Sequence, residues 1–439
     1  MKPTVAEVVA VVGGGWAGCA AAVELARAGS AVTLFEASRT LGGRARRIEA
    51  GGRTLDNGQH ILLGAYAATL RLLATVGVDR RRALLTLPLQ MRYPDGAMDF
   101  VAPRLPAPLH LAVALLRAKG LAREDKLAMA RFSTSARWMD WRLDLDCSVT
   151  ELLARFSQTE RLYRLMWRPL CLAALNTPPE RASANVFLAV LRDSLGARRH
   201  ASDMLVPRAD LSALFPDAAA QWLTAHGATV RTGARVDALA RDGDTWRIGD
   251  EAFDRIVVAV APAGAAALLA PLPDSAALTA QLDALTPEPI TTCYLQYEAG
   301  VRLAQPFFAL EDAPETGRWG QFVFDRGQLD DRQAGMLAEI VSASGAAAAL
   351  PRQDLAAAVA AQLASALGRP ELAAPAWSSV VTEKRATYAS TPGLIRPANA
   401  TPWPGLVLAG DYTAGEYPAT LEMAVRSGVL AAGLARRAN

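Results

Sequence analysis

The N-terminal segment changes from one hydrophobic pattern to another in a regular way. A continuous run of apolar, mostly β-branched residues at Val8–Val12 predicts a buried parallel strand. Small and apolar residues at helical spacing over residues 17–28 predict a helix, which Gly29 can end. A second apolar run at residues 31–35 predicts a second strand. The pattern therefore predicts a βαβ unit at the start of the chain.

The middle of the chain is mainly helical and then returns to short strands. Ala, Leu and Arg dominate residues 67–204, and Ser148 with Glu151 has the spacing of a capping box, so this stretch is predicted to be helical. An amphipathic helix through Trp222 follows. Short apolar runs then predict strands at residues 228–231, 234–241, 245–248 and 254–260.

The C-terminal part continues this alternation. Between residues 271 and 385, an alanine-rich helix that ends near Gly368 follows strand-like runs at residues 291–297, 320–324 and 336–342. A strand at residues 406–409 and a helix at residues 420–437 close the chain. We therefore predict an α/β fold in which the chain leaves its first domain and returns to it more than once.

Charge and cysteine usage exclude several classes of function. The 46 basic and 43 acidic side chains nearly balance, so no nucleic-acid partner is expected. Cys19, Cys147, Cys171 and Cys293 lack metal-ligand spacing, so no metal site is expected, and they are typical of thiols in a reducing cytosol. The longest uncharged run, residues 256–273, contains prolines that break a membrane-spanning helix. A cytoplasmic location is expected.

A glycine-rich turn joins the first predicted strand to the first predicted helix. The string Gly-Gly-Gly-Trp-Ala-Gly at residues 13–18 matches G-x-G-x-x-G, and Glu36 ends the second strand. These glycines allow a tight turn, a close approach to a pyrophosphate and close helix packing, while the acid can bind a ribose diol. The motif predicts a dinucleotide site that comprises Gly13, Gly15, Trp16, Ala17, Gly18, Glu36 and Ala37.

Further segments resemble the flavin-binding motifs of the amine oxidase and phytoene desaturase superfamily. A second glycine pair with an arginine follows Glu36, and the strings at residues 406–411 and 420–428 resemble the C-terminal flavin motif. The resemblance implies FAD, with Asp411 on a ribityl hydroxyl and the helix start facing the reactive ring. No Cys or His lies in the C-terminal motif, so the FAD is expected to be non-covalent. The implied cofactor residues are Gly42, Gly43, Arg44, Val236, Gly410, Asp411, Thr420 and Leu421.

Two strings narrow the resemblance. The strings Asp-Asn-Gly-Gln-His at residues 56–60 and Trp-Arg-Pro-Leu-Cys-Leu-Ala-Ala-Leu-Asn-Thr-Pro at residues 167–178 closely resemble the bacterial hydroxysqualene dehydroxylases. This resemblance runs nearly end to end and places Gly58, Gln59 and His60 beside the isoalloxazine. It implies a Rossmann-like FAD-binding domain assembled from residues 1–66, 205–270 and 386–439. A mixed α+β substrate-binding domain, with a large helical insertion, would comprise residues 67–204 and 271–385.

The resemblance also implies a reaction. An allylic hydroxyl of hydroxysqualene would leave as water, and hydride from reduced FAD would quench the allylic cation, giving squalene for hopanoid or related triterpenoid synthesis. The implied partners are a lipophilic C30 isoprenoid and upstream enzymes of the squalene pathway. Two alternatives stay open: a carotenoid or other isoprenoid desaturase or isomerase, and a flavin-less prenyl-chain carrier. The intact Glu36 and Gly410-Asp411 argue against the carrier.

Candidate proton donors lie near the implied flavin. His60 is the first choice, because an imidazolium is available near neutral pH, although its ring could instead only shape the loop. Tyr412 and Glu416 are second choices, together with Tyr417. Glu422, in the first turn of the last helix, is predicted to be a dipole partner.

One apolar segment has two interpretations. Residues 105–116 are apolar and are followed by basic residues, so they could contact the membrane surface and collect a lipid substrate, or form a core helix of the substrate domain. The first interpretation would place the protein at the inner face of the membrane. Three tryptophans also have two interpretations: they could line the substrate tunnel or fill the core. They are Trp138, Trp141 and Trp167.

Overall fold

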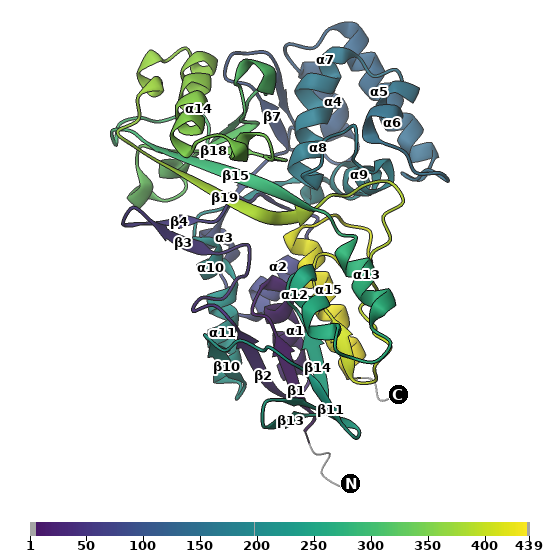
Figure 1. Ribbon diagram of the computed structural model, residues 1–439. Coiled ribbons are helices and arrows are strands. Elements are labelled where there is room, and N and C mark those ends of the chain that lie inside the picture. Colours follow the sequence, from purple (N-terminus) through teal and green to yellow (C-terminus); the bar gives the residue numbers. More distant parts are fainter. Residues whose placement is uncertain (1–5, 197, 437–439) are drawn as a thin grey trace.

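The computed structural model describes residues 6–196 and 198–436 and consists of two parts, one above the other in Figure 1. The lower part is built on a five-stranded sheet of order β10-β2-β1-β14-β20, in which every neighbouring pair is parallel. Its strands are β1 (Val8–Val12), β2 (Ala31–Glu36), β10 (Thr229–Thr232), β14 (Arg255–Val258) and β20 (Leu406–Leu408). The predicted βαβ unit and the returns of the chain to this sheet are confirmed.

Helices cover both faces of the parallel sheet. On one face lie α1 (Trp16–Arg27), α2 (Ala67–Thr75), α10 (Leu211–Leu214), α11 (Pro216–Ala225) and α15 (Leu421–Ala435). On the other lie α12 (Pro262–Leu269), α13 (Ala276–Asp283) and the small sheet of β11 (Ala240–Asp242), β12 (Thr245–Ile248) and β13 (Glu251–Phe253). The boundaries expected after residues 66 and 270 are therefore misplaced, because α2 and α13 pack into the lower part. The rest of the domain division stays a prediction.

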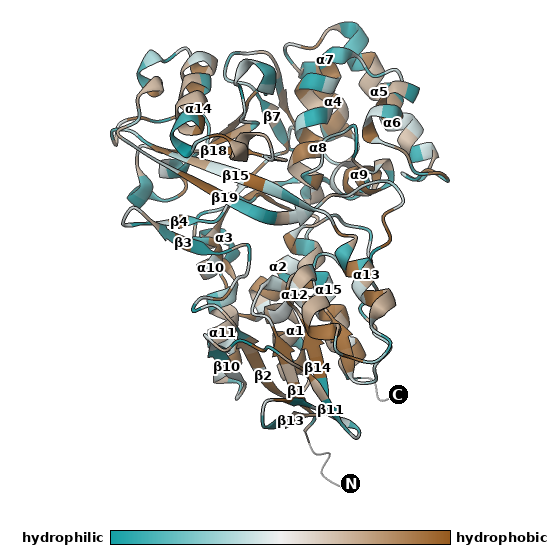
Figure 2. Ribbon diagram, in the orientation of Figure 1, coloured by the Kyte–Doolittle hydropathy of each residue, from teal (hydrophilic) through white to brown (hydrophobic). Residues whose placement is uncertain are grey.

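The upper part contains a second five-stranded sheet, of order β16-β17-β18-β15-β19, in which every neighbouring pair is antiparallel. Its strands are β15 (Pro287–Gln296), β16 (Phe307–Ala309), β17 (Phe322–Asp325), β18 (Met336–Val341) and β19 (Trp377–Tyr388). The sequence analysis missed β19, because Ser, Thr, Glu, Lys and Arg occupy most of its positions. Its pairing with β15 holds it in place. Figure 2 shows the contrast: β1, β2 and β14 are hydrophobic, whereas β19 is mixed.

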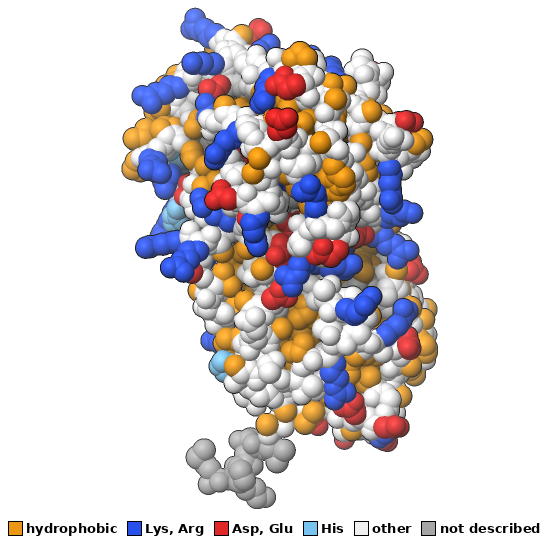
Figure 3. All heavy atoms as spheres, turned by 90° about the vertical axis from the view of Figure 1, so that its left-hand side faces the viewer, with side chains coloured by type: hydrophobic (Ala, Val, Ile, Leu, Met, Phe, Trp, Pro, Cys, Tyr) orange, Lys and Arg blue, Asp and Glu red, His pale blue; other side chains and the backbone are white. Residues whose placement is uncertain are grey.

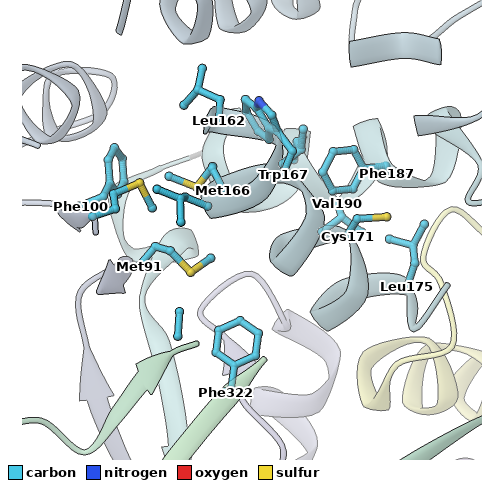
Figure 4. Packing of buried hydrophobic residues seen from close by; sticks show 14 of the residues in the cluster. Met91, Phe100, Leu162, Met166, Trp167, Cys171, Leu175, Phe187, Val190 and Phe322 are labelled. Carbon is cyan, nitrogen blue, oxygen red and sulfur yellow. The ribbon is translucent and has the colours of Figure 1, made fainter. Parts of the chain in front are cut away.

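Helices also cover both faces of the antiparallel sheet. Helix α14 (Arg352–Leu367) packs on the face of Cys293 and Leu295, and the opposite face, with Tyr294 and Ala338, meets the helical region. That region comprises α4 (Leu109–Arg117), α5 (Arg123–Trp138), α6 (Val149–Arg155), α7 (Glu160–Leu162), a π-helix (Tyr163–Trp167), α8 (Arg168–Leu175), α9 (Ala184–Leu191) and a second π-helix (Arg192–Gly196). Figure 4 shows side chains of these helices, among them Met166 and Trp167, in one cluster with Phe322 of β17.

The structure confirms and corrects the remaining sequence predictions. The capping box of Ser148 and Glu151 is present at the start of α6. The segment 67–204 is not purely helical, since strand pairing with the segment around Leu205 and a separate hairpin interrupt it. The additional elements are α3 (Arg80–Ala83), β3 (Arg47–Ala50), β4 (Arg53–Asp56), β5 (Leu62–Leu63), β6 (Leu84–Leu87), β7 (Gln90–Arg92), β8 (Asp99–Val101) and β9 (Met204–Pro207).

Two predicted elements differ in their bounds. Of the strand expected at residues 234–241, only the end lies in a strand, β11. The amides of Gly233 and Ala234 instead bond to the carbonyls of Ser38 and Glu36, at the end of β2. The last helix ends at Ala435, and its expected end at residue 437 lies outside the described residues. On the face shown in Figure 3, acidic and basic side chains are both present, in agreement with the nearly balanced charge.

Candidate active site

The glycine turn after β1 has the geometry of a phosphate cradle. Gly13 has a φ of +109°, and a Cβ there would lie 2.5 Å from the carbonyl oxygen of Ala259. A Cβ on Gly18 would overlap the carbonyl oxygen of Gly13. Gly15, in contrast, is open: the nearest atom to an added Cβ is the Cα of Gly43, at 3.8 Å. The first and third glycines are thus needed for packing, and the second leaves room for a ligand.

The N-terminus of α1 is available to an anion. Its N-cap residue, Gly15, provides no capping side chain, and no acidic residue lies in its first turn. The amides of this turn and the positive end of the helix dipole therefore have no negative group of the helix's own to satisfy them. The turn contains Trp16, Ala17 and Gly18, the residues of the sequence motif.

Glu36 is held in place at the carboxyl end of β2. Its Oε2 accepts a hydrogen bond of 2.7 Å from the amide of Gly14, and its Oε1 accepts one of 2.8 Å from the amide of Ser38. Each carboxylate oxygen keeps a second lone pair for a hydroxyl donor. Ala37 lies between these residues. The arrangement suits recognition of a ribose diol, as the sequence motif predicts.

Arg44 connects distant segments of the chain. The amide of Gly42 donates to the carbonyl of Gly14, which joins the second glycine pair to the first. The Arg44 guanidinium lies 2.6 Å from Asp411 Oδ1 and donates at 2.8 Å to the carbonyl of Ala386. Residues expected from three separate motifs thus meet at the carboxyl edge of the parallel sheet, where ligands bind in such sheets.

The segment 57–61 separates its two polar side chains. Gln59 lines a large cavity, and its amide is fixed by hydrogen bonds of 2.8 Å to Tyr294 Oη and 2.7 Å from Arg326. His60 is absent from the described lining, and its Nδ1 lies 3.3 Å from the carbonyl oxygen of Gly58. Burial lowers the pKa of His60, and the nearby Arg44 cation lowers it further. The imidazolium expected near neutral pH is therefore disfavoured, and the role of His60 as proton donor stays an unsupported prediction.

The cavity has a volume of about 730 Å³ and is walled mainly by apolar side chains of both parts of the molecule. At one end it reaches exposed residues of the helical region, among them Leu116 (73% exposed) and Trp138 (88% exposed). Elsewhere it reaches Gln59 and Thr420. Its aromatic lining residues are Tyr66, Phe100, Phe132, Trp138, Trp141, Trp167, Phe322, Phe324 and Tyr417. Trp141 and Trp167 thus both fill the core and line the cavity.

Of the other candidate acids, Tyr412, Glu416 and Glu422 are not among the described lining residues of the cavity, whereas Tyr417 is. The Tyr412 ring is buried against Gly410, and its hydroxyl has no hydrogen-bond partner within the described chain. Glu416 is exposed and pairs at 2.8 Å with Arg192. Glu422 accepts hydrogen bonds from the amides of Ala68 and Thr69, so it caps α2 and is more than a dipole partner of its own helix. Catalysis by Tyr412 or Glu416 has no support from this placement.

The remaining predicted cofactor residues lie at the edges of this site. Thr420 caps α15 by accepting from the amide of Met423 at 3.2 Å, and Leu421 is the first residue of that helix. Val236 lies in the irregular segment between β10 and β11 and packs against the core of the lower part. A contact of its backbone with adenine stays a prediction.

Two residues of the site, Asp193 and Arg326, could not be identified from the sequence. Asp193 and Tyr417 line the cavity together, and the Tyr417 hydroxyl donates to Asp193 Oδ2 at 2.6 Å. Arg326, which is almost fully buried, fixes Gln59 and lies 3.8 Å from Asp56. Asp193 and Arg326 belong to no recognisable motif. Tyr417 was named among the candidate proton donors, because it lies beside the C-terminal flavin string.

These features fit a flavin dinucleotide. The glycine cradle, the uncapped helix N-terminus and the Glu36 carboxylate suit a pyrophosphate and a ribose. The hydroxyl of Tyr412, the residue after Asp411, is buried without a partner among the described residues. Within residues 6–196 and 198–436, no cluster of three potential metal ligands occurs. No helix in the described ranges is long and apolar enough to cross a membrane.

Comparison with known proteins agrees with this geometry. Residues 16–435 match the family of flavin containing amine oxidoreductases. The hydroxysqualene dehydroxylase of Rhodopseudomonas palustris is 32% identical, and the alignment covers 97% of both chains. That of Sinorhizobium fredii is 29% identical, over 97% of this chain and 98% of the relative.

The solved structures agree on the fold. Cyclohexylamine oxidase from Brevibacterium oxydans superposes with a TM-score of 0.68 at 20% identity, over 98% of each chain, which confirms the predicted α/β fold. The chain therefore belongs to the flavin containing amine oxidoreductase family, as an FAD-dependent oxidoreductase of the hydroxysqualene dehydroxylase group.

Proposed function

We propose that this enzyme removes the allylic hydroxyl group of hydroxysqualene reductively and releases squalene for hopanoid or related triterpenoid synthesis. The observation that carries the proposal is the large apolar cavity with a polar group at Asp193 and Tyr417, which suits a long hydrocarbon with one hydroxyl. The names of the two full-length relatives support the same substrate.

FAD would lie along the carboxyl edge of the parallel sheet. The adenosine and pyrophosphate would be held by the glycine turn, Glu36 and Arg44, and the ribityl chain by Asp411. When reduced, the bound FAD would supply the hydride. The N-terminus of α15 is suited to stabilise negative charge on the reduced FAD. The Glu422 carboxylate in the first turn of α15 does not satisfy this N-terminus, because it accepts hydrogen bonds from the amides of α2. The proposed holding residues are Gly13, Gly15, Trp16, Ala17, Gly18, Glu36, Ala37, Gly42, Gly43, Arg44, Gly58, Gln59, His60, Val236, Gly410, Asp411, Thr420 and Leu421.

The cavity wall has two tasks in this reaction. It keeps water from the allylic cation, because most of the lining side chains are apolar. Its aromatic side chains, which include Trp141 and Trp167, carry negative π density on their ring faces, and such a face stabilises a nearby cation. The walls thus favour quenching by hydride over recapture of water.

We also propose that the mouth of the cavity contacts the membrane surface from the cytoplasm. Five exposed apolar side chains belong to α4, α5 and the segment before them: Leu105, Leu109, Leu116, Leu127 and Trp138. Two of them line the cavity mouth. Exposed basic residues accompany them, at Arg104, Arg117, Lys119, Arg123 and Arg137. Apolar side chains with surrounding cations suit an anionic bilayer surface, from which a water-insoluble substrate could enter.

Membrane contact can be tested by flotation with anionic vesicles. Replacing both Leu116 and Trp138 with Glu should weaken vesicle binding roughly tenfold or more, since burial of each such side chain stabilises by about 1.5–3 kcal/mol. Leu430→Glu, at another exposed position, is the matched control and should bind like the wild type. Equal binding of all three proteins would exclude this surface. Contact with upstream squalene-pathway enzymes remains a prediction.

Product analysis tests the proposed reaction. Anaerobically reduced enzyme with hydroxysqualene should yield squalene, a product that lacks the oxygen atom and can be identified by mass spectrometry. Oxidised enzyme with phytoene should yield no desaturated product. Desaturation of phytoene with no squalene formed would favour the carotenoid desaturase. A purified protein that is colourless and does not take up FAD would favour the prenyl-chain carrier.

A further inference from the structure

The cavity contains one carboxylate in an apolar surrounding. Among the lining residues that the structure describes, Arg137 and Asp193 are the charged ones. Arg137 is exposed and precedes Trp138 at the mouth, whereas Asp193 lies in the second π-helix and its side chain is 24% exposed. A carboxylate costs free energy at an apolar surface unless its partners compensate it. A carboxylate at this position therefore indicates a function in binding a polar group.

A network of contacts fixes this carboxylate. Asp193 Oδ2 accepts the hydrogen bond of 2.6 Å from the Tyr417 hydroxyl, and Oδ1 accepts one of 2.7 Å from Arg192 Nε. Arg192 also pairs with Glu416. The guanidinium of Arg426 lies 4.4 Å from the centre of the Tyr417 ring. Side chains from the π-helix, the 410–420 segment and α15 thus position one pair, Asp193 and Tyr417.

The two members of the pair have complementary protonation states. Burial opposes charge on Asp193, but the hydrogen bonds from Arg192 and Tyr417 outweigh it and lower the pKa of Asp193. Burial, and then the hydrogen bond to Asp193, raise the pKa of Tyr417. Near neutral pH, Asp193 is therefore an acceptor only, and Tyr417 keeps its phenolic proton. An alcohol, which both donates and accepts one hydrogen bond, matches this pair.

We propose that Asp193 and Tyr417 bind the hydroxyl group of the substrate: the Tyr417 hydroxyl donates to the substrate oxygen, and Asp193 accepts the substrate's hydroxyl proton. When the substrate binds, the hydrogen bond from Tyr417 to Asp193 is replaced by two, one from Tyr417 to the substrate oxygen and one from the substrate hydroxyl to Asp193. The proposal rests on the proposed function and names the residues that recognise its substrate. The hydrocarbon product has no hydroxyl, so the pair closes again and favours substrate over product.

Other polar groups of the cavity fit this role less well. The Gln59 amide is bonded to Tyr294 and Arg326, and the Ser194 hydroxyl donates to the carbonyl of Val190. Gln90 lines the cavity, and its amide nitrogen is buried without a partner in the described residues. It lies on β7, however, which contacts β16, the edge of the antiparallel sheet opposite β19. Tyr417, by contrast, is three positions before Thr420, at the proposed flavin site.

Gln90, the other candidate for binding the substrate hydroxyl, therefore lies in a different part of the cavity. β16 is separated from β15 by two strands, and adjacent strands lie about 4.8 Å apart. β15 carries Tyr294, which bonds to Gln59 beside His60. In the proposed reaction, the carbon that carries the hydroxyl receives the hydride, so the hydroxyl must bind near FAD. A hydroxyl bound at Gln90 would lie far from the residues proposed to hold FAD. This distance favours the Asp193–Tyr417 pair.

Equilibrium binding to the oxidised holoenzyme tests the proposal without turnover. Tyr417→Phe and Asp193→Asn should each weaken hydroxysqualene binding roughly ten- to a hundred-fold, the range for a hydrogen bond to a charged group, and leave squalene binding unchanged. Tyr163→Phe is the matched control: its hydroxyl donates at 2.6 Å to Glu180, and Tyr163 is not among the described lining residues. It should bind both ligands like the wild type. Flavin absorbance confirms that each variant is folded.

The outcomes separate this proposal from the proposed function. Equal weakening for hydroxysqualene and squalene would show a merely structural role and overturn the inference, as would unchanged binding of both. Selective loss in Gln90→Leu, with Tyr417→Phe unaffected, would place the hydroxyl at β7 and also overturn it. In each of these cases the wild type still forms squalene. A wild type that forms no squalene and binds no hydroxysqualene would instead refute the proposed function, and this inference with it.

Discussion

The two five-stranded sheets of this protein serve different kinds of recognition. At the carboxyl edge of the parallel sheet, the binding groups are backbone amides exposed by glycines and fixed by Glu36 and Arg44. At the antiparallel sheet, side chains of β17 and β18 and of the facing helices form the wall of an apolar cavity. The first region recognises a cofactor through polypeptide geometry, and the second recognises a hydrocarbon through shape.

This difference predicts unequal tolerance to substitution. Backbone recognition depends on space that a single added carbon removes, so changes in the cradle should act on FAD binding as a whole. An apolar wall is made of many weak contacts, so one change should alter activity toward a given substrate and leave the cofactor in place. The tests below, ordered by size of effect, address this contrast.

The largest effect is expected at Gly18. A Cβ there would overlap the carbonyl oxygen of Gly13, so Gly18→Ala must displace either β1 or α1. Overpacking of this kind costs about 1–3 kcal/mol, which is roughly a ten- to hundred-fold loss of FAD affinity. Gly433→Ala in α15 is the control, because an added Cβ has open space there. Flavin absorbance per polypeptide measures both, and full FAD content in Gly18→Ala would refute the role of the cradle.

A smaller effect, on stability, is expected at Glu422. Its fully buried carboxylate binds the amides of Ala68 and Thr69 and pairs with Arg426, so it ties α2 to α15 in the lower part. Glu422→Ala should lower the free energy of unfolding by about 1–2 kcal/mol, because these donors lose their acceptor. Glu422→Gln keeps one oxygen and should lose less. Denaturant titration would contradict this role if both variants unfolded like the wild type.

The cavity wall should respond in a different way. Ala174 is a partly buried lining residue of α8, and Ala174→Phe would occupy space that the substrate needs. We expect FAD content to stay the same and kcat/KM for the C30 substrate to fall roughly tenfold or more, since overpacking costs about 1–3 kcal/mol. Ala361→Phe, at an exposed position of α14, is the control. Loss of FAD in Ala174→Phe would mean that the two regions are not independent.

The same contrast decides what could be predicted from the sequence. The parallel sheet is buried on both faces, so its strands are continuous apolar runs, and its ligand geometry requires glycines at fixed spacing. Both signals are local, and the βαβ unit, Glu36 and the glycine pairs are placed as predicted. Arg44 and Asp411 were predicted as cofactor residues, but their 2.6 Å contact joins segments far apart in the chain.

The substrate region gave weaker signals for a physical reason. β19 carries polar residues on a half-buried strand, so its apolar pattern is faint, and pairing with β15 decides its structure. Asp193 is an ordinary acidic residue of a helix until the 410–420 segment folds over it and brings Tyr417 within 2.6 Å. His60 was the first choice as proton donor because of its chemistry, and that role stays a prediction, although burial and the Arg44 cation lower its pKa.

The smallest effect concerns Asp56, where the two regions meet. Its carboxylate accepts from the amide of Leu211 and lies near Arg326. Burial raises the pKa of Asp56 from 3.8 to about 6, although the Arg326 cation opposes the shift. The folded state thus favours the protonated form, so the stability contributed by this group is highest below pH 4 and falls as the pH rises through 6.

Asp56→Asn removes this titration. The free energy of unfolding of the variant, relative to the wild type, should therefore increase by about 1 kcal/mol from pH 5 to pH 7. Parallel pH profiles of the two proteins would show that the junction leaves the carboxylate unperturbed and that the two regions meet at a solvated boundary.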